Sequence, residues 1–288
     1  MLLMGGCLLP GPDSAAQGGC VTAQCHATLL KAGTLHPPVE SCDSCHESTG
    51  APHPGQGAKT FKLVQEPPGL CATCHDPIGT KSQVHPPAQE GMCTTCHDPH
   101  ASDQPKLLVQ PIRDLCQSCH AQTQARFLHA PVSAGDCTAC HAPHESDNAK
   151  LLVREFPLSP YVPYTDAEFA LCFGCHNRDM VRYPGTSVAT GFRDGERNLH
   201  YVHVHNALKG RSCALCHEPH GSNSPRLVAD SVPFGTWRLP LKFVKSETGG
   251  SCAPGCHRPQ AYDRQSPGRK PVAPKPGPAP HGRHRFQG

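Results

Sequence analysis

One short pattern recurs along this chain of 288 residues: a cysteine, two or more other residues, a second cysteine and then a histidine. Seven copies have two residues between the cysteines, and two copies have wider gaps of four and three residues. Eighteen of the nineteen cysteines belong to this pattern. Any fold of the chain must therefore accommodate nine copies of it. The cysteines are Cys20 and Cys25, Cys42 and Cys45, Cys71 and Cys74, Cys93 and Cys96, Cys116 and Cys119, Cys137 and Cys140, Cys172 and Cys175, Cys213 and Cys216, and Cys252 and Cys256.

The histidine that follows every second cysteine excludes the common uses of paired cysteines. Structural zinc sites are built from four cysteines or from two cysteines and two histidines, and they do not require a histidine at this position. A disulfide scaffold or a thioredoxin-like redox pair fails for the same reason. Only 21 of the 288 residues are histidines, so nine occurrences in nine motifs are not an accident.

Cys-x-x-Cys-His is the attachment sequence of c-type haem. On a helical turn, residues three and four apart share a face, so two thioethers can form while the histidine reaches the iron. We therefore predict nine haem c groups, at seven regular motifs, one Cys-x4-Cys-His and one Cys-x3-Cys-His. The predicted proximal ligands are His26, His46, His75, His97, His120, His141, His176, His217 and His257.

The composition leaves little material for an ordinary core. Leu, Ile, Val and Phe make up about 17 % of the chain, below the usual level of a globular domain. The 32 prolines and 27 glycines break long helices and strands. We predict a mostly irregular coil with short α-helices and few short strands, folded around haems and elongated.

The other histidines also repeat at fixed places beside the motifs. One lies six or eight residues before a motif, and another follows the motif histidine by three residues in HDPH, HAPH and HEPH, or by seven in HESTGAPH. A short aliphatic stretch then leads to a second motif. This gives four repeats, at residues 36–75, 85–120, 129–176 and 205–257, within a haem-binding region at 20–260. The predicted distal ligands of these repeats are His36, His53, His85, His100, His129, His144, His205 and His220.

His100 illustrates how these histidines are expected to act. It cannot bind the iron held by His97, because the sixth ligand approaches from the opposite face and Pro99 stops the helical turn that would carry it there. We therefore expect His100 to bind a neighbouring haem.

The haem at the N-terminal motif needs one further ligand, for which His203 or His200 in LHYVHVHN is the candidate. With both axial positions filled by imidazole, an iron has no position for a substrate and exchanges electrons only. We therefore predict an electron carrier and not an enzyme. Two alternatives stay open: a multihaem reductase with one open haem, and a subunit of an extracellular cytochrome filament.

The pattern HxPx(5)CxxCHxPHxS with a later LCxxCH resembles the multihaem c-type cytochromes with the doubled CXXCH motif, over residues 20–260. The resemblance implies bis-histidine haems, little regular secondary structure and electron transport in anaerobic respiration. The chain looks most like periplasmic components of outer-membrane conduits in metal-reducing bacteria. The implied partners are other redox proteins, including an outer-membrane porin and an outer-surface cytochrome. The nine motifs, two of them widened, depart from the decahaem type of that group.

Covalent haem attachment takes place outside the cytoplasmic membrane, so we expect a periplasmic or outer-membrane-associated protein, with an extracellular location as the alternative. Residues 1–19 resemble a truncated signal or lipoprotein-like N-terminus. Cys7, which follows MGG, is either a lipid-anchor site or a residue of a discarded signal. The sequence contains no run of about 20 apolar residues, so we predict no transmembrane span.

The C-terminal part differs from the rest in charge and composition. Residues 258–288 hold seven basic residues and one acidic residue, against a net charge of +3 for the whole chain. The remainder is therefore acidic, and haem propionates would make it more so, which argues against nucleic-acid binding. Residues 261–288 predict a disordered, basic, Pro/Gly-rich tail.

Two local signals stand out between the motifs. TWRLPLKFV at residues 236–244 places Trp237, Leu239, Leu241 and Phe243 at a period of two, which predicts a strand. Pro240 favours an edge position, either over a haem face or as a docking edge. Asp194-Gly195 predicts a turn.

Overall fold

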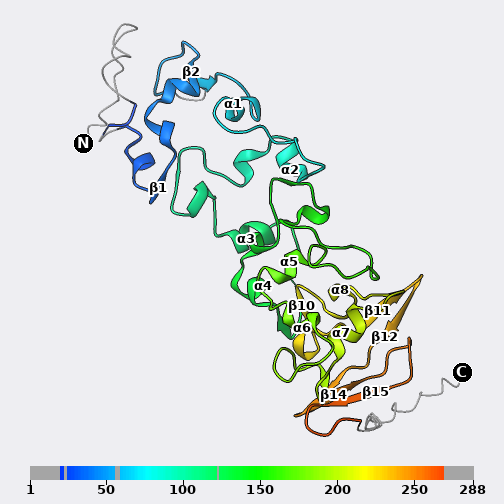
Figure 1. Ribbon diagram of the computed structural model, residues 1–288. Coiled ribbons are helices and arrows are strands. Elements are labelled where there is room, and N and C mark those ends of the chain that lie inside the picture. Colours follow the sequence, from blue (N-terminus) through cyan, green and yellow to red (C-terminus); the bar gives the residue numbers. More distant parts are fainter. Residues whose placement is uncertain (1–19, 23–24, 56–58, 122, 269–288) are drawn as a thin grey trace, which may run out of the picture. The chain divides into compact units, whose positions relative to one another are not determined.

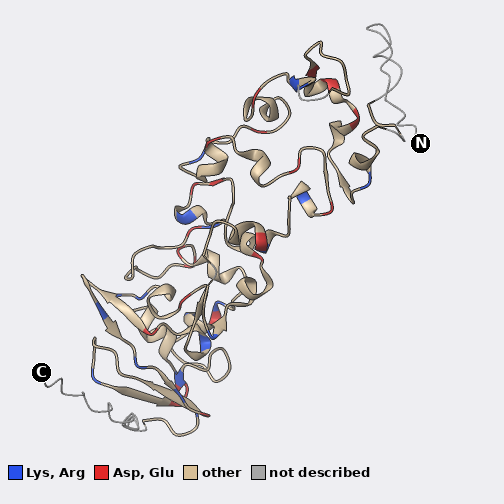
Figure 2. Cartoon of the chain, turned by 180° about the vertical axis from the view of Figure 1, so that it is seen from behind, with Lys and Arg blue, Asp and Glu red and all other residues tan. Residues whose placement is uncertain are grey.

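A computed structural model of the chain describes residues 20–22, 25–55, 59–121 and 123–268 (Figure 1). The predicted N-terminal segment 1–19 with Cys7, and residues 269–288 of the predicted tail, lie outside the described residues. The described chain is mostly coil with short helices and strands, which confirms the predicted fold class. Basic and acidic residues are interspersed along it (Figure 2).

Frequent prolines, glycines and cysteine motifs keep the helices of the described residues short. The α-helices have four to six residues: α1 (Gly69–Ala72), α2 (Pro86–Gln89), α3 (Ile112–Gln117), α4 (Ala130–Ala134), α5 (Ala170–Phe173), α6 (Asp179–Arg182), α7 (Leu199–Val204) and α8 (Cys213–Cys216). The 3-10 helices, labelled η, are η1 (Ala27–Leu30), η2 (Pro37–Glu40), η3 (Cys42–Ser44), η4 (Cys93–Thr95), η5 (Pro105–Leu107), η6 (Cys137–Ala139), η7 (Ala149–Leu151) and η8 (Pro225–Leu227).

Three small antiparallel sheets of one kind link the start of one repeat to the next repeat. Their strands are β1 (Thr34–Leu35) with β5 (Ala101–Ser102), β4 (Gln83–Val84) with β7 (Glu145–Ser146), and β6 (Phe127–Leu128) with β10 (Gly221–Ser222). Beside each sheet, the N–H of the histidine that opens one repeat donates to the carbonyl of an HxPH histidine of the next. These bonds join His36 to His100 at 2.8 Å, His85 to His144 at 2.8 Å and His129 to His220 at 3.1 Å. Pairs of predicted distal ligands are thus held side by side by the backbone.

The other strands form hairpins and one three-stranded sheet. β2 (His46–Ser48) pairs with β3 (Phe61–Leu63), β8 (Arg193–Asp194) with β9 (Arg197–Asn198), and β11 (Ser231–Phe234) with β12 (Trp237–Pro240). The last sheet consists of β13 (Val244–Lys245), β14 (Gly249–Cys252) and β15 (Gln260–Asp263). Gly195 has a φ of 56° between β8 and β9, which confirms the turn predicted at Asp194-Gly195.

The predicted strand at 236–244 is only partly formed. β12 ends at Pro240, in a two-stranded sheet where proline is tolerated, and β13 begins at Val244. β15 occupies the start of the predicted disordered tail, where Asp263 is buried and accepts a hydrogen bond from Thr248 Oγ1 at 2.7 Å. Ordered structure therefore continues beyond residue 260.

The chain divides into two compact units, and the third predicted repeat, residues 129–176, is split between them. Unit 1 comprises residues 1–122 and 131–155, and unit 2 comprises residues 123–130 and 156–288. Among the described residues of unit 1, the buried hydrophobic side chains are those of Val39 and Leu152. This unit has almost no conventional core, as the composition predicts.

Unit 2 differs, because it contains two small hydrophobic clusters. One surrounds the fully buried Phe169, and the other includes Val232 and Leu241. Much of this material comes from the motif-poor segments at 177–204 and 226–251. All of the chain's Phe, Trp and Tyr residues except Phe61 belong to this unit. No helix among the described residues has the length and apolar character needed to cross a bilayer.

Candidate haem-binding sites

The cysteine–histidine motifs fold as single helical turns. In six of the seven regular motifs, the histidine N–H donates to the carbonyl of the first cysteine at 2.9 to 3.1 Å. The first motif of a repeat opens a short turn, η3, η4, η6 or α8, whereas the second motif lies at the end of α1, α3 or α5. Each turn brings both thiols and the histidine to one region of the surface.

Seven motif histidines face a second histidine from elsewhere in the chain. Their ring centroids are 5.8 to 6.4 Å apart, with interplanar angles of 12° to 40°. The pairs are His26 with His53, His46 with His100, His75 with His36, His97 with His144, His120 with His85, His176 with His129, and His217 with His200.

This spacing fits a metal held between two imidazoles. Because a first-row metal binds an imidazole nitrogen at about 2 Å, two imidazoles on opposite sides of one metal have ring centres about 6 Å apart. Rings in direct face contact would be separated by only about 3.5–4.0 Å. Two cysteines precede the motif histidine of each pair, and this donor set fits a bis-histidine haem c.

The pairs follow one rule along the repeats. The histidine that opens a repeat faces the second motif of the same repeat, as His36 faces His75. The HxPH histidine faces the first motif of the preceding repeat, so His100 lies opposite His46 and not opposite His97. His53 faces the N-terminal motif. His220 has the equivalent HxPH position in the fourth repeat and stays a predicted distal ligand.

Several rings are oriented through Nδ1, which leaves Nε2 free to bind a metal. The Nδ1–H of His97 donates to the carbonyl of Lys106 at 2.9 Å, and that of His36 donates to the carbonyl of Pro99 at 2.8 Å. The same bond at 3.0 Å joins His141 to Lys150 and His217 to Arg226.

Helix α7 supplies two candidate ligands. His200 faces His217 at 6.4 Å, and burial lowers the pKa of His200 to about 4, which keeps it neutral at pH 7. Three residues later, the Nδ1–H of His203 donates to the carbonyl of Leu199 at 2.6 Å. Burial lowers the pKa of His203, and Arg211 and His257 act in the same direction. His203 therefore lies within electrostatic reach of the proximal histidine of the last motif.

His205 does not occupy the place that the repeat pattern predicts for it. Its ring lies 4.2 Å from the rings of both Tyr164 and Tyr201, and its Nε2–H donates to the carbonyl of Val181 at 3.0 Å. The nitrogen that would bind iron is thus used in a hydrogen bond. His205 therefore stays a predicted distal ligand whose Nε2 is engaged in this structure, and His203 is the second candidate for the last motif.

One of the eighteen motif cysteines differs from the others. Cys25 is disulfide-bonded, whereas the other seventeen carry free thiols. A thioether at Cys25 requires that this disulfide be reduced first. The Cys-x4-Cys-His motif thus differs from the other eight in the state of its second cysteine.

Attachment cysteines of consecutive motifs interact with one another within each unit. In unit 1, burial raises the pKa of Cys116 to about 11, and Cys137 adds to this increase. In unit 2, a hydrogen bond with Cys172 raises the pKa of Cys213. The interactions join Cys20 with Cys42, Cys45 with Cys71, Cys71 with Cys93, Cys96 with Cys119, Cys116 with Cys137, Cys172 with Cys213, and Cys216 with Cys252 and Cys256.

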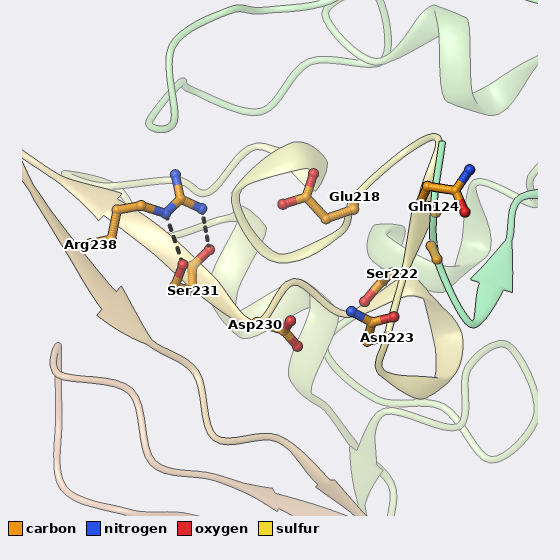
Figure 3. A pocket seen from close by; sticks show the side chains of 9 residues that line it. Gln124, Glu218, Ser222, Asn223, Asp230, Ser231 and Arg238 are labelled. Carbon is orange, nitrogen blue, oxygen red and sulfur yellow. Dashed lines mark hydrogen bonds between the residues drawn. The ribbon is translucent and has the colours of Figure 1, made fainter. Parts of the chain in front are cut away.

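A polar cavity of about 280 Å³ lies beside the motif of His217 (Figure 3). Glu218 and Asp230 line it, and Arg238 donates hydrogen bonds to the hydroxyl and the carbonyl oxygen of Ser231 at 2.8 and 3.0 Å. The described residues contain no cluster of three or more side chains suited to a bare metal ion. The cavity therefore adjoins the haem-binding turn through Glu218, the residue after His217.

Some residues around these sites carry no sequence signal. Phe192 lies 5.1 Å from the His200 ring and 5.6 Å from the His203 ring, so one aromatic side chain contacts both candidate ligands of α7. For Phe192 itself no pattern in the sequence indicates this position. The two histidines do have a signal, because residues three apart share a helix face and His200 and His203 have that spacing.

Comparison with known proteins gives one family. A family model described as the doubled CXXCH motif matches the chain four times, at residues 36–80, 85–125, 129–181 and 205–234, which together make up more than half of it. No curated protein matches the chain.

Proposed function

Since the chain belongs to the doubled-CXXCH family of multihaem c-type cytochromes, we propose that it binds nine haem c groups and relays electrons through them between redox partners. The family supports covalent haem and electron transfer. The number nine, the ligand set and the cellular setting are the proposal.

We number the haems 1 to 9 in the chain order of their motifs. The proposed ligand pairs are His26 and His53 for haem 1, His46 and His100 for haem 2, His75 and His36 for haem 3, His97 and His144 for haem 4, His120 and His85 for haem 5, His176 and His129 for haem 7, His217 and His200 for haem 8, and His257 and His203 for haem 9. His141 is the proximal ligand of haem 6.

The observation that carries the proposal is the set of seven histidine pairs at 5.8 to 6.4 Å. Haem supplies one-electron redox chemistry, and the protein fixes the axial ligands, their orientation and the burial of each iron. Two imidazoles on an iron leave no coordination position for a substrate, which favours an electron carrier over a reductase.

The interactions between attachment cysteines support an order for the relay. Within unit 1, consecutive motifs interact from Cys20 through Cys137, and within unit 2 they interact from Cys172 through Cys256. Thioether sulfurs lie at the edges of their haems, so neighbouring sulfurs bring neighbouring haem edges close together. We propose that electrons pass in chain order, haem 1 to haem 6 in unit 1 and haem 7 to haem 9 in unit 2, or the reverse.

The proposed setting is anaerobic respiration between the periplasm and the outer membrane. Covalent haem attachment outside the cytoplasmic membrane and the resemblance to outer-membrane-conduit cytochromes support it. The proposed partners are other redox proteins, including a porin and an outer-surface cytochrome.

A pyridine haemochrome assay combined with intact mass tests the proposal. The expected result is nine haems per chain and no binding of carbon monoxide by the native ferrous protein. A colourless protein, or one that folds with zinc, would refute haem binding altogether. Stoichiometric carbon monoxide binding in the native protein would instead favour a reductase with one open haem.

A further inference from the structure

After the first motif of the second, third and fourth repeats, the backbone makes the same unusual turn. Lys106 and Leu107 have φ angles of 59° and 57°, Lys150 and Leu151 have 60° and 55°, and Arg226 and Leu227 have 62° and 56°. Two successive residues with side chains in the left-handed region are disfavoured, because the Cβ atom crowds the backbone. Three copies of one strained conformation indicate a shared structural task. We call these three segments the carbonyl turns.

Each carbonyl turn aims a backbone oxygen at a proximal histidine. The carbonyl of the first left-handed residue accepts a hydrogen bond from Nδ1–H of His97, His141 or His217, at 2.9, 3.0 and 3.0 Å. The acceptor lies nine residues after the histidine in all three copies. The turn is thus a fixed partner of the iron-binding ring.

Two further backbone bonds fix each turn on either side of the histidine. Asp98 N–H donates to the carbonyl of Leu107 at 2.8 Å, and Val109 N–H donates to the carbonyl of Cys96 at 3.0 Å. The third and fourth repeats form the same two bonds, from Ala142 to Leu151 and Val153 to Cys140, and from Glu218 to Leu227 and Ala229 to Cys216. The histidine lies between these bonds, so its backbone is held at a fixed place relative to the turn.

A serine secures the far end of each turn. Ser102 Oγ donates to the carbonyl of Leu108 at 2.5 Å and accepts from Gln104 N–H at 2.9 Å. Ser146 and Ser222 form the same two bonds in the next repeats. This is the serine of the HxPHxS pattern, and the structure gives it a role as support for the turn. In the fourth repeat Ser222 also borders the polar cavity of Figure 3.

The second motifs of the first three repeats lack this arrangement, whereas Nδ1–H of His257, in the fourth, donates to the carbonyl of Arg258 at 2.7 Å without a carbonyl turn. In the described part of the chain, Nδ1 of His75, His120 and His176 forms no hydrogen bond to a protein acceptor, and these three rings are exposed. His97, His141 and His217 are less exposed. The carbonyl turn therefore distinguishes haems 4, 6 and 8 from haems 3, 5 and 7.

We propose that the carbonyl turns at Lys106, Lys150 and Arg226 are positioning elements that lower the reduction potentials of haems 4, 6 and 8. A carbonyl that accepts the Nδ1 proton makes the imidazole a stronger electron donor, which stabilises the ferric iron over the ferrous iron. The side chains play no part in this effect, because the acceptor is a backbone oxygen held by its φ angle. The inference rests on the proposed function, since it concerns the same haems.

The test compares two triple variants of the full haem-loaded chain. One carries Lys106→Val, Lys150→Val and Arg226→Val, because a β-branched residue strongly disfavours a positive φ. The matched control carries glycine at the same three positions, which loses the same three charges but adopts a positive φ readily. Both are compared with the unchanged protein by spectroelectrochemical titration of the haem absorbance.

For the valine variant, three of the nine haems should move to higher potential by a tenfold change in the ferric-to-ferrous ratio, which is about 59 mV. In the glycine variant these three haems should keep the potentials of the unchanged protein, so the two variants should differ by the whole of that shift. Coincident titrations of the two variants, with the haem count unchanged, would overturn the inference and leave the proposed function standing.

Haem counts by intact mass separate this failure from a failure of the proposed function. If the protein without substitutions contained no haem, the proposed function would be refuted, and the inference that rests on it would fail for that reason and not because of the turns. If the triple valine variant fails to accumulate, Lys106→Val alone is compared with Lys106→Gly. The reduction potential of one haem in nine should then differ between these two variants. The spread of the low-spin EPR g values gives a second readout, because it responds to imidazole donor strength and not to folding stability.

Discussion

His203 and His205 lie two residues apart at the end of α7, and they offer a direct test of the ligand assignment. The repeat pattern favours His205, whereas the structure places His203 near His257 and encloses His205 between two tyrosines. We consider His203→Ala and His205→Ala, each in the full haem-loaded chain. The two changes remove the same chemical group from neighbouring positions.

The expected effects differ in kind. Removing His203 should open one axial position among nine haems, so about one ninth of the haem becomes able to bind carbon monoxide. Removing His205 deletes the 3.0 Å hydrogen bond to Val181 and ring contacts at 4.2 Å to Tyr164 and Tyr201. At about 1 kcal/mol for the hydrogen bond and a similar amount for the ring contacts, it should lower the free energy of unfolding by about 2 kcal/mol and open no iron.

The assay is a carbon monoxide difference spectrum of the reduced protein, scaled to total haem, together with thermal unfolding. His203→Ala should bind one carbon monoxide per chain, and His205→Ala should bind none. His205→Phe is the matched control, because it retains a ring between the tyrosines and loses only the hydrogen bond. Carbon monoxide binding by His205→Ala and not by His203→Ala would refute the assignment and restore the repeat-based prediction.

Three further predictions concern other parts of the molecule. Phe169→Ala should lower the free energy of unfolding by about 3–5 kcal/mol because the ring is fully buried, whereas Phe234→Ala, at a position 57 % exposed, should change the melting temperature little. Hydrogen bonds from Thr80 Oγ1 and from the N–H groups of Gly79, Thr80 and Lys81 lower the pKa of Glu145 from 4.5 to about 2. The stability that this carboxylate contributes is therefore present above about pH 4.5 and is lost as the pH falls toward 2. Glu145→Gln should melt below the unchanged protein at pH 7 and together with it near pH 2, and an equal difference at both pH values would contradict the cause given. Cys20→Ser with Cys25→Ser should reduce the intact mass by one haem, and an unchanged haem count would show that the disulfide-bonded Cys25 keeps haem 1 from forming.

Covalent spacing explains why so much of the site was predictable from the sequence. Thioether attachment fixes two cysteines and a histidine within one turn, so the nine motifs are visible without a structure. Local geometry also showed which iron His100 does not bind, since Pro99 prevents it from reaching the iron of the adjacent His97 motif. Its partner could not be predicted, because His46 lies 54 residues earlier and is brought to it by the β1–β5 sheet.

The fourth repeat shows what residue spacing alone does not reveal. His205 has the correct distance from Cys213, but spacing does not reveal which ring nitrogen is free, and the Val181 carbonyl occupies Nε2. The strand β15 was missed because the surrounding composition resembles a disordered tail, although buried Asp263 holds it in place. In both cases a long-range contact overrides a local signal.

The spin state of the fully oxidised protein tests the central claim most directly, because bis-histidine ligation makes every ferric haem low-spin. We predict resonance Raman and EPR spectra that contain six-coordinate low-spin haem only, at nine haems per chain. A stoichiometric high-spin component in the native protein would contradict the account.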